Sequence, residues 1–318
     1  MISDRLAYVA LAVAEPAAAA AMFERDFGLP RREVPCGGRS IPVLGIGRSA
    51  LAFFAVGDPF VAGLERPGLH HVALAAADPD AAARSAREEG VGALTESVTA
   101  GLGGGERILL DPNATCGVRV AFTPPLTGLP VPDDGAVQRM DHLGVASRDN
   151  AEALQVFVNR LGLPLESTQT DVETRIAYES FTSDTYGVVH HAREPEVVGG
   201  LRVAFVIVGD CELEFLQELG PQGPPRVEAG RAGTTEQDQG AVARYIAQRG
   251  AGLHHLAFKV TDIDAMLERL AQAGHGLIDR VGRPGSRRAR IAFLHPRTTA
   301  GVLLHLVERG ERHQEQRS

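Results

Sequence analysis

Four residues with strong metal-ligand side chains lie in apolar, strand-like runs in the second half of the chain: His142, Glu214, His255 and His305. A histidine flanked by apolar residues, as in 303–307 (LLHLV), points into the interior or into a cleft, because side chains alternate across a strand. Three neutral imidazoles and a carboxylate suit a divalent Zn, Fe, Co, Ni or Mn ion, whereas Mg and Ca prefer oxygen ligands. Each histidine alone is more typical of a hydrogen-bonded core residue, but four pseudo-symmetric ligands predict one divalent transition metal.

The strands that carry these residues belong to repeated units. Two short apolar runs, 140–146 and 253–259, are each followed by an Asp and then by a helical pattern, over 150–161 and 263–273. Each unit then returns through apolar, partly β-branched runs that are typical of strands: 202–207 and 211–217 in one, 289–294 and 302–308 in the other. Each unit therefore has the order strand, helix and about three strands.

The first half of the chain repeats this plan. Residues 5–30 align without a gap on 139–164 at an offset of 134, and 68–71 (GLHH) match 252–255 at an offset of 184. The larger second offset places insertions between 165 and 251. We therefore expect an α+β fold of four tandem βαβββ modules in two paired-module domains, 1–125 and 139–310, joined by a Pro/Gly-rich linker at 126–138 and followed by a polar tail at 311–318.

Composition limits the classes of function. The chain is 44% hydrophobic and 23% charged, with a net charge of −8, which is typical of a globular protein. Its length of 318 residues predicts about two domains. The acidic balance, the absence of Trp and the 5% aromatic content disfavour a nucleic-acid partner. No apolar run approaches the ~18 residues of a membrane span, and the N-terminus lacks a signal-peptide pattern, so a cytoplasmic location without membrane contact is expected. Three widely spaced cysteines argue against a disulfide framework.

Four segments of the second half carry a family resemblance. The chain resembles methylmalonyl-CoA epimerase, of the vicinal oxygen chelate (glyoxalase/bleomycin resistance/dioxygenase) superfamily, over 140–149, 203–219, 249–279 and 283–308. The superfamily also holds glyoxalase I and the extradiol and 4-hydroxyphenylpyruvate dioxygenases. The resemblance implies cupped mixed sheets around one divalent metal, with ligand positions at the four residues named above. His305 departs from the pattern, because the family normally has a glutamate in that strand.

The resemblance also suggests catalytic residues. Epimerases of this type have a glutamate just before the strand at 202–207; this chain has valines there, and the adjacent Glu196 is the candidate base. His305 occupies the strand from which glyoxalase I takes a proton-transferring glutamate. The insertion at 170–200 contains His191 and is expected to be either a lid that brings a proton shuttle to the metal or a solvated loop.

The first half has lost most of the predicted ligands. The repeat places Tyr8, Ala52, His71 and Ala121 opposite the four ligand positions of the second half. Only one of the four keeps a ligand side chain. We therefore expect the first half to be metal-free and structural, with His71 a core histidine.

Three functions remain open from the sequence. The first is a metal-dependent isomerase or epimerase that stabilises an enolate of an acyl thioester or oxoacid. The alternative is a non-haem Fe(II) dioxygenase acting on a catechol-like compound or a 2-oxoacid, which the tandem architecture favours and the missing glutamate opposes. The third is a metal-free protein that binds small molecules, as in antibiotic resistance. The expected partner is a small-molecule substrate, with either a monomer or a homodimer as the assembly.

Overall fold

The computed structural model describes residues 3, 5–130, 135–176, 178–192, 195–220 and 240–310. The first half forms one eight-stranded sheet with the strand order β2-β3-β4-β1-β5-β8-β7-β6. Its strands are β1 (Leu6–Val13), β2 (Arg31–Cys36), β3 (Arg39–Ile46), β4 (Ser49–Ala55), β5 (Gly68–Ala75), β6 (Thr99–Ala100), β7 (Glu106–Leu109) and β8 (Val120–Thr123). Helix α1 (Pro16–Phe27) follows β1, and α2 (Pro79–Glu88) follows β5.

The second half forms an equivalent eight-stranded sheet, with the order β10-β13-β14-β9-β15-β18-β17-β16. Its strands are β9 (Val137–Ala146), β10 (Leu165–Arg175), β13 (Glu196–Val208), β14 (Cys211–Glu218), β15 (Gly252–Val260), β16 (Arg283–Pro284), β17 (Arg290–Leu294) and β18 (Leu303–Glu308). Its helices are α3 (Asn150–Leu154), which continues as a π-helix over Gln155–Arg160, α4 (Ala241–Arg249) and α5 (Ile263–Gln272). The two sheets confirm the α+β fold of paired βαβββ modules.

Local sequence signals explain where the module helices begin. Asp78, Asp149 and Asp262 precede α2, α3 and α5, and each aspartate side chain accepts a hydrogen bond from a backbone N–H of the first helical turn. Such N-caps satisfy donors that would otherwise lack a partner. Helix α1 has no such cap and begins instead at Pro16, whose fixed φ suits the first turn.

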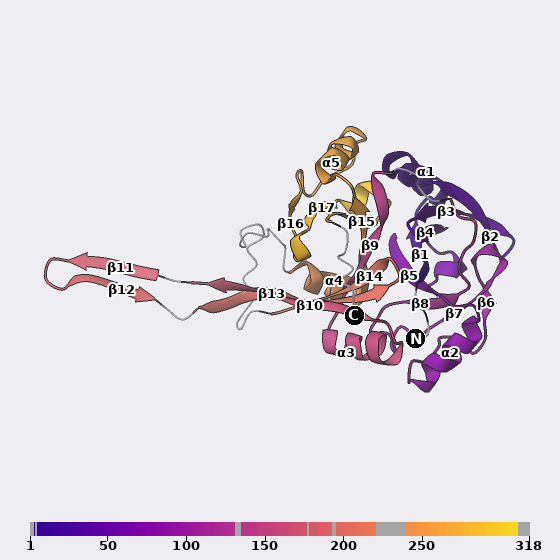
Figure 1. Cartoon of the computed structure of the whole chain (residues 1–318), viewed down its shortest axis with the longest axis horizontal. Coiled ribbons are helices and arrows are strands. Elements are labelled where there is room, and N and C mark those ends of the chain that lie inside the picture. Colours follow the sequence, from indigo (N-terminus) through magenta and orange to yellow (C-terminus); the bar gives the residue numbers. More distant parts are fainter. Residues whose placement is uncertain are drawn as a thin grey trace, which may run out of the picture.

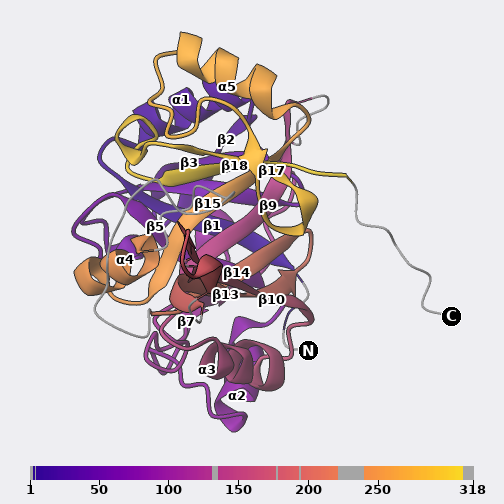
Figure 2. The same ribbon diagram turned by 90° about the vertical axis from the view of Figure 1, so that its left-hand side faces the viewer.

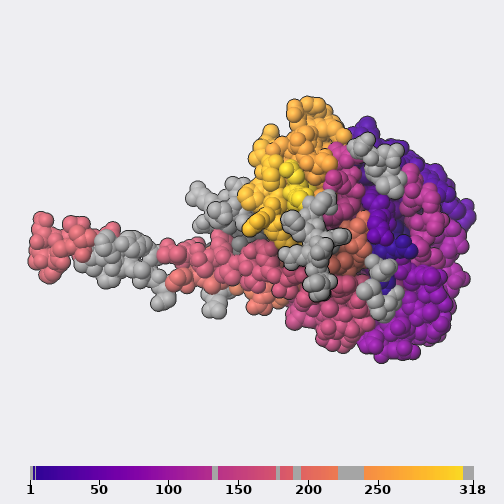
Figure 3. Space-filling view, viewed as in Figure 1, coloured from indigo at the N-terminus to yellow at the C-terminus, as the bar shows by residue number. Residues whose placement is uncertain are grey.

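A long arm extends from the second sheet. Strands β10 and β13 continue beyond the sheet, and β11 (Tyr178–Ser183) pairs with β12 (Gly187–Ala192) further out. Figures 1 and 3 show this arm projecting away from the body of the protein. Apolar and aromatic side chains on it are exposed, including Ile176 and Tyr186. The hairpin of β11 and β12 within the 170–200 insertion therefore lies away from the body, and a role of the insertion as a lid stays a prediction.

The two halves share one hydrophobic core that contains residues of both sheets. Helices α1 and α5 lie side by side at one end of the molecule (Figure 2). Phe27 packs edge-on against Phe258 with ring centroids 5.5 Å apart, and the buried His275 contacts Asp26 at 2.9 Å. Among the described residues, no helix has the length and apolarity needed to cross a membrane.

Candidate metal centre

The strand register brings the four predicted ligands together at the centre of the second sheet. His142, Glu214, His255 and His305 lie on β9, β14, β15 and β18, four strands that are neighbours in the order β14-β9-β15-β18. Gly144 of β9 is the register partner of both Glu214 and His255. His305 is the register partner of Ala257, two residues beyond His255. We call these four residues the ligand group.

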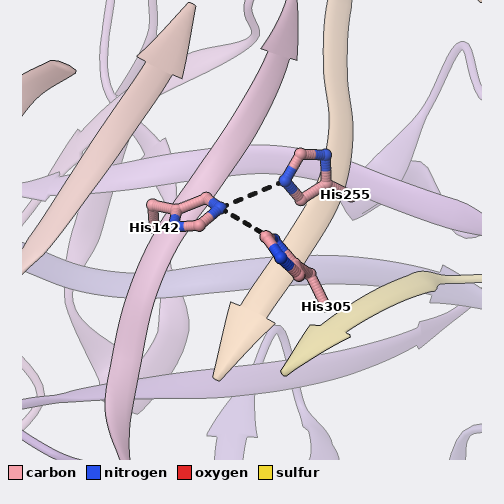
Figure 4. A group of neighbouring side chains, drawn as sticks. All are labelled: His142, His255 and His305. Atoms are coloured by element: carbon pink, nitrogen blue, oxygen red, sulfur yellow. Dashed lines mark hydrogen bonds between the residues drawn. The ribbon is translucent and has the colours of Figure 1, made fainter. Parts of the chain in front are cut away.

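The side chains of the ligand group converge on His142. Its Nε2 lies 3.2 Å from His255 Nε2, 3.1 Å from His305 Nδ1 and 3.2 Å from Glu214 Oε2. Glu214 Oε2 also lies 3.4 Å from His255 Nε2. All four residues are buried. Figure 4 shows the three imidazoles pointing toward one another from three strands.

These separations fit a shared metal ion. Ligand atoms at roughly 2.0–2.2 Å from one ion are about 2.8–3.6 Å apart in tetrahedral or octahedral geometry. All the printed distances fall in that range. A ring nitrogen carries either one hydrogen or one lone pair, so His142 Nε2 cannot hydrogen-bond well to three neighbours at once. The three histidine nitrogens all lie within 4.8 Å of one another, and Glu214 contacts two of them, His142 and His255. The three imidazoles, with this carboxylate beside two of them, therefore fit a divalent transition metal better than a hydrogen-bond network.

Gly144 gives His255 the space to reach the group. A Cβ atom at residue 144 would lie 2.1 Å from His255 Cε1 and 2.2 Å from its Nδ1, far inside contact distance. A glycine at this position therefore leaves room for the His255 imidazole to extend over β9 toward His142. The sequence alone does not reveal this requirement, because it depends on which residue lies opposite Gly144.

A β-bulge places an additional carboxylate beside His142. The pairing of β9 with β15 shifts register between His142 and Met140, and Asp141 occupies the shift. Asp141 is fully buried, and its Oδ1 lies 3.6 Å from His142 Nδ1. A carboxylate behind a histidine ligand orients the ring and raises its basicity. The sequence analysis missed Asp141, because strict alternation assigns it to the opposite face.

His255 also has a partner on its outer side. His254 Nδ1 lies 3.1 Å from His255 Nδ1, and the Tyr245 ring stacks edge-on against His254 at 4.7 Å. This contact leaves His255 Nε2 to face the ligand group. On the other side of the group, Phe293 lies parallel to His305 with ring centroids 4.2 Å apart. The two contacts restrict the orientation of both imidazoles.

The charges of the group are strongly coupled. Burial alone would lower the pKa of His142, but the carboxylates of Glu214 and Asp141 outweigh it and raise the pKa to about 9. Burial would raise the pKa of Glu214, but His142 and His255 hold it well below its usual range. Burial lowers the pKa of His255 and takes that of His305 well below the usual value. At neutral pH, the metal-free group thus contains His142 as a charged imidazolium, an ionised Glu214 and two neutral imidazoles.

Arginines neutralise the other carboxylates near the group. Glu212 is fully buried, and its Oε2 lies 2.6 Å from Arg287 Nη2 and 3.6 Å from Arg309 Nη2. Arg309 also forms an ion pair with Asp141. The Arg287 guanidinium stacks on Phe205, 3.6 Å from the ring centroid. Glu212 and Asp141 are thus held by arginines, whereas Glu214 is held by the imidazoles of His142 and His255.

The backbone at Arg287 is strained. Arg287 and Arg288 have φ values of 54° and 58°, and the residues 184 positions earlier, Gly103 and Gly104, have 71° and 76°. The turn between the last strands of the module therefore requires left-handed backbone, which glycine adopts readily and a residue with a Cβ adopts at about 1–2 kcal/mol. The ion pair of Arg287 with buried Glu212 offsets this cost.

The structure does not bring the other predicted catalytic residues to the group. Glu196 is the first residue of β13 and is exposed, whereas the residue of β13 opposite Glu214 is Phe205. Nine residues of extended strand separate Glu196 from Phe205, about 30 Å at roughly 3.3 Å per residue. The backbone of His191 lies in β12 of the arm, and its side chain lies outside the described residues. Catalytic roles for both remain predictions.

The first sheet has the same register without the ligands. Ala10 of β1 pairs with both Ala52 and His71, as Gly144 does with Glu214 and His255, and Ala73 pairs with Ala121. His71 is fully buried, and its Nδ1 lies 2.7 Å from His70 Nδ1. The positions aligned from sequence are therefore structurally equivalent to the ligand group.

A cleft lies between the two halves. Its volume is about 760 Å³, and its lining includes residues of α1, α4, the starts of β5 and β15, and the loop before β18. His254 is among them, but no member of the ligand group is. The cleft therefore reaches the outer partner of His255 and not the ligand group itself.

Comparisons with known proteins agree with this geometry. An uncharacterized protein from Bacillus subtilis, YqjC, is 28% identical over 180 residues, which cover 56% of this chain and 99% of YqjC. The ethylmalonyl-CoA/methylmalonyl-CoA epimerase of Cereibacter sphaeroides is 28% identical over 128 residues, 39% of this chain and 82% of the epimerase.

Among solved structures, a mutant of 4-hydroxymandelate synthase from Streptomyces coelicolor has the same fold over nearly the whole chain. The TM-score is 0.64 at 16% identity, with 98% of this chain and 94% of the synthase covered. The family model described as Glyoxalase/Bleomycin resistance protein/Dioxygenase superfamily matches residues 141–293, which contain His142, Glu214 and His255. Residues 141–293 of this protein therefore form a domain of the glyoxalase/bleomycin resistance/dioxygenase superfamily.

Proposed function

We propose that the protein is a metal-dependent isomerase or epimerase that stabilises the enolate of an acyl thioester or oxoacid. The observation that carries this proposal is the convergence of His142, Glu214, His255 and His305 within 3.1–3.4 Å contacts. The similarity to an acyl-CoA epimerase supports the substrate class. The ion is one divalent transition metal, Co, Zn, Mn, Ni or Fe.

In this proposal the ligand group holds the ion and controls protons around it. A bound divalent ion would act as a Lewis acid on a substrate carbonyl. His142 is a charged imidazolium when no metal is bound. Binding of the metal ion to its Nε2 at neutral pH should therefore release one proton. Asp141 then fixes the tautomer of His142, and His254 fixes that of His255.

Proton transfer to and from the substrate needs a neutral base. His305 is the candidate that the fold brings to the group: its Nδ1 faces His142, and its buried Nε2 has no hydrogen-bond partner among the described residues. Burial and the neighbouring imidazoles hold its pKa well below the usual value, so its ring is neutral. We assign to His305 either the fourth ligand position or the transfer of the α proton at Nε2. Glu196 and His191 remain candidates that would require the arm to move.

The test is metal content together with exchange of the α proton of methylmalonyl-CoA in deuterated buffer. His255→Ala should lose metal and exchange together, because it removes a ligand. His71→Ala is the matched control, since it removes the equivalent histidine of the first half, and it should keep both. Full exchange activity in protein stripped of metal would contradict the proposal.

A dioxygenase is the second candidate, and the tandem architecture favours it. The likeness to 4-hydroxymandelate synthase spans 98% of this chain, whereas the epimerase match spans 39%. Substrate-dependent oxygen uptake by anaerobically iron-loaded protein, over a panel of catechols and 2-oxoacids, distinguishes the two. Uptake with stoichiometric turnover would favour the oxygenase, and proton exchange without uptake would favour the isomerase.

A further inference from the structure

One face of the first sheet carries Tyr8, Phe54, Phe60 and Ala121, and we call it the inner face. It contains a buried cation, Arg107, where the second sheet has its ligand group. Arg107 of β7 points to the same side as Tyr8 and packs over the Phe60 ring, with its Cζ 3.4 Å from the ring centroid. The Arg107 residue is only 6% exposed. Apolar side chains, such as Phe54 and Ala121, also line this face.

Arg107 has no counter-ion within the part of the chain that the structure describes. Neither its Nε nor its Nη1 has a hydrogen-bond partner, although both atoms are buried. Asp58, the carboxylate whose charge acts on Arg107, is held by Arg39 and by the backbone N–H of Phe60. A buried guanidinium that lacks a counter-ion, and that has two nitrogens without hydrogen-bond partners, costs considerable free energy. The Phe60 ring alone compensates only part of it.

Two other buried polar atoms on this face also lack partners among the described residues. They are the Tyr8 hydroxyl oxygen and His71 Nε2, which occupy two of the four positions equivalent to the ligand group. Both Tyr8 and His71 are fully buried, and the charge of Arg107 acts on both. Buried polar atoms in native proteins are usually paired with protein, water or an ion, so a cluster of unpaired atoms around a buried cation marks a place for a bound anion or water.

We propose that the first half binds a small monovalent anion, a halide ion or a carboxylate of the size of formate, on this inner face. The Arg107 guanidinium supplies the countercharge, and the Tyr8 hydroxyl donates a hydrogen bond to the anion. The site occupies the place in the first sheet that the ligand group occupies in the second. The two halves thus bind ions of opposite sign at equivalent positions: the second a divalent cation, the first an anion.

The test measures thermal unfolding of the full-length, metal-loaded protein in sodium chloride, sodium formate and sodium gluconate at equal ionic strength. Gluconate serves as the reference anion, because it is too large for the buried face. A ligand that binds only the folded state raises the midpoint. We expect chloride or formate at 300 mM to raise the wild-type midpoint above the gluconate value by about 2 °C or more. The salt that gives the rise identifies the source as halide or carboxylate.

The Arg107→Met variant should show no rise of the unfolding midpoint in chloride or formate. In gluconate its midpoint should equal or exceed that of wild type, because the substitution removes an unpaired buried charge. Tyr8→Phe preserves the packing of the ring and should weaken the apparent anion affinity about 3- to 10-fold, which keeps the test informative if Arg107→Met does not fold. Arg87→Met, at an exposed position of α2, is the control and should respond like wild type. Equal responses of wild type and Arg107→Met to chloride and formate, including no response in either, would overturn the proposal.

Discussion

Replacing Gly144 with alanine tests the geometry of the metal centre with the addition of a single methyl group. The new Cβ would lie 2.1 Å from His255 Cε1, whereas ordinary carbon contacts begin at about 3.5 Å. The imidazole must therefore move by about 1.5 Å. Metal–ligand bonds tolerate about 0.2 Å, so His255 would cease to be a ligand. We expect the affinity for a divalent metal to fall about 100-fold or more, since even changes behind the ligands cost about 10- to 100-fold.

The substitution should not unfold the protein. Gly144 does not have left-handed φ, and the equivalent residue of the first sheet is Ala10, which pairs with His71 in the same register. The cost of overpacking is about 1–3 kcal/mol of unfolding free energy. The assay is titration with Co²⁺ or Zn²⁺ by calorimetry, together with urea unfolding. Ala10→Gly is the matched control and should leave metal affinity unchanged. Metal affinity of Gly144→Ala within about threefold of wild type would refute the argument.

Three further substitutions examine the surroundings of the site and the contact between the halves. Asp141→Asn should lower metal affinity by about 10- to 100-fold, measured by competition with a chelator, because it weakens the carboxylate behind His142. Phe258→Ala should lower the unfolding free energy by about 3–5 kcal/mol in urea, because Phe258 is fully buried between the halves. Asp26→Asn should cost about 1–3 kcal/mol at pH 7, through the loss of the ionised partner of His275. Because the hydrogen bond from Arg25 and the contact with His275 lower the pKa of Asp26, this difference should be full above pH ~4 and vanish as the pH falls through the lowered pKa.

The fold was predictable because the chain repeats its own pattern. The offsets of 134 and 184 residues aligned Tyr8 with His142 and His71 with His255, and the strand pairings place these residues at equivalent positions. Capping aspartates such as Asp262 marked the helix starts. These signals are local or periodic, so a single sequence contains them.

What the sequence did not reveal depends on departures from regular pairing. The bulge at Asp141 turns two successive side chains toward one site, which the alternation rule forbids. The extension of β10 and β13 into the arm carries Glu196 away from the ligand group, although its position along the chain suggested proximity. The unpaired charge of Arg107 is visible only once its surroundings are known, because an isolated arginine in a strand is ordinarily a surface residue.

The most direct test of the central claim is the number and kind of metal ions per chain, measured by plasma mass spectrometry on protein purified anaerobically without added metal. The structure predicts about one divalent transition metal per chain in wild type and in His71→Ala, and none in His142→Ala. Among the described residues, the second sheet is where three histidines bring their nitrogens together, with Glu214 beside two of them. Absence of any bound metal from wild type, even after incubation with Co²⁺, Zn²⁺, Mn²⁺, Ni²⁺ and Fe²⁺, would contradict the account.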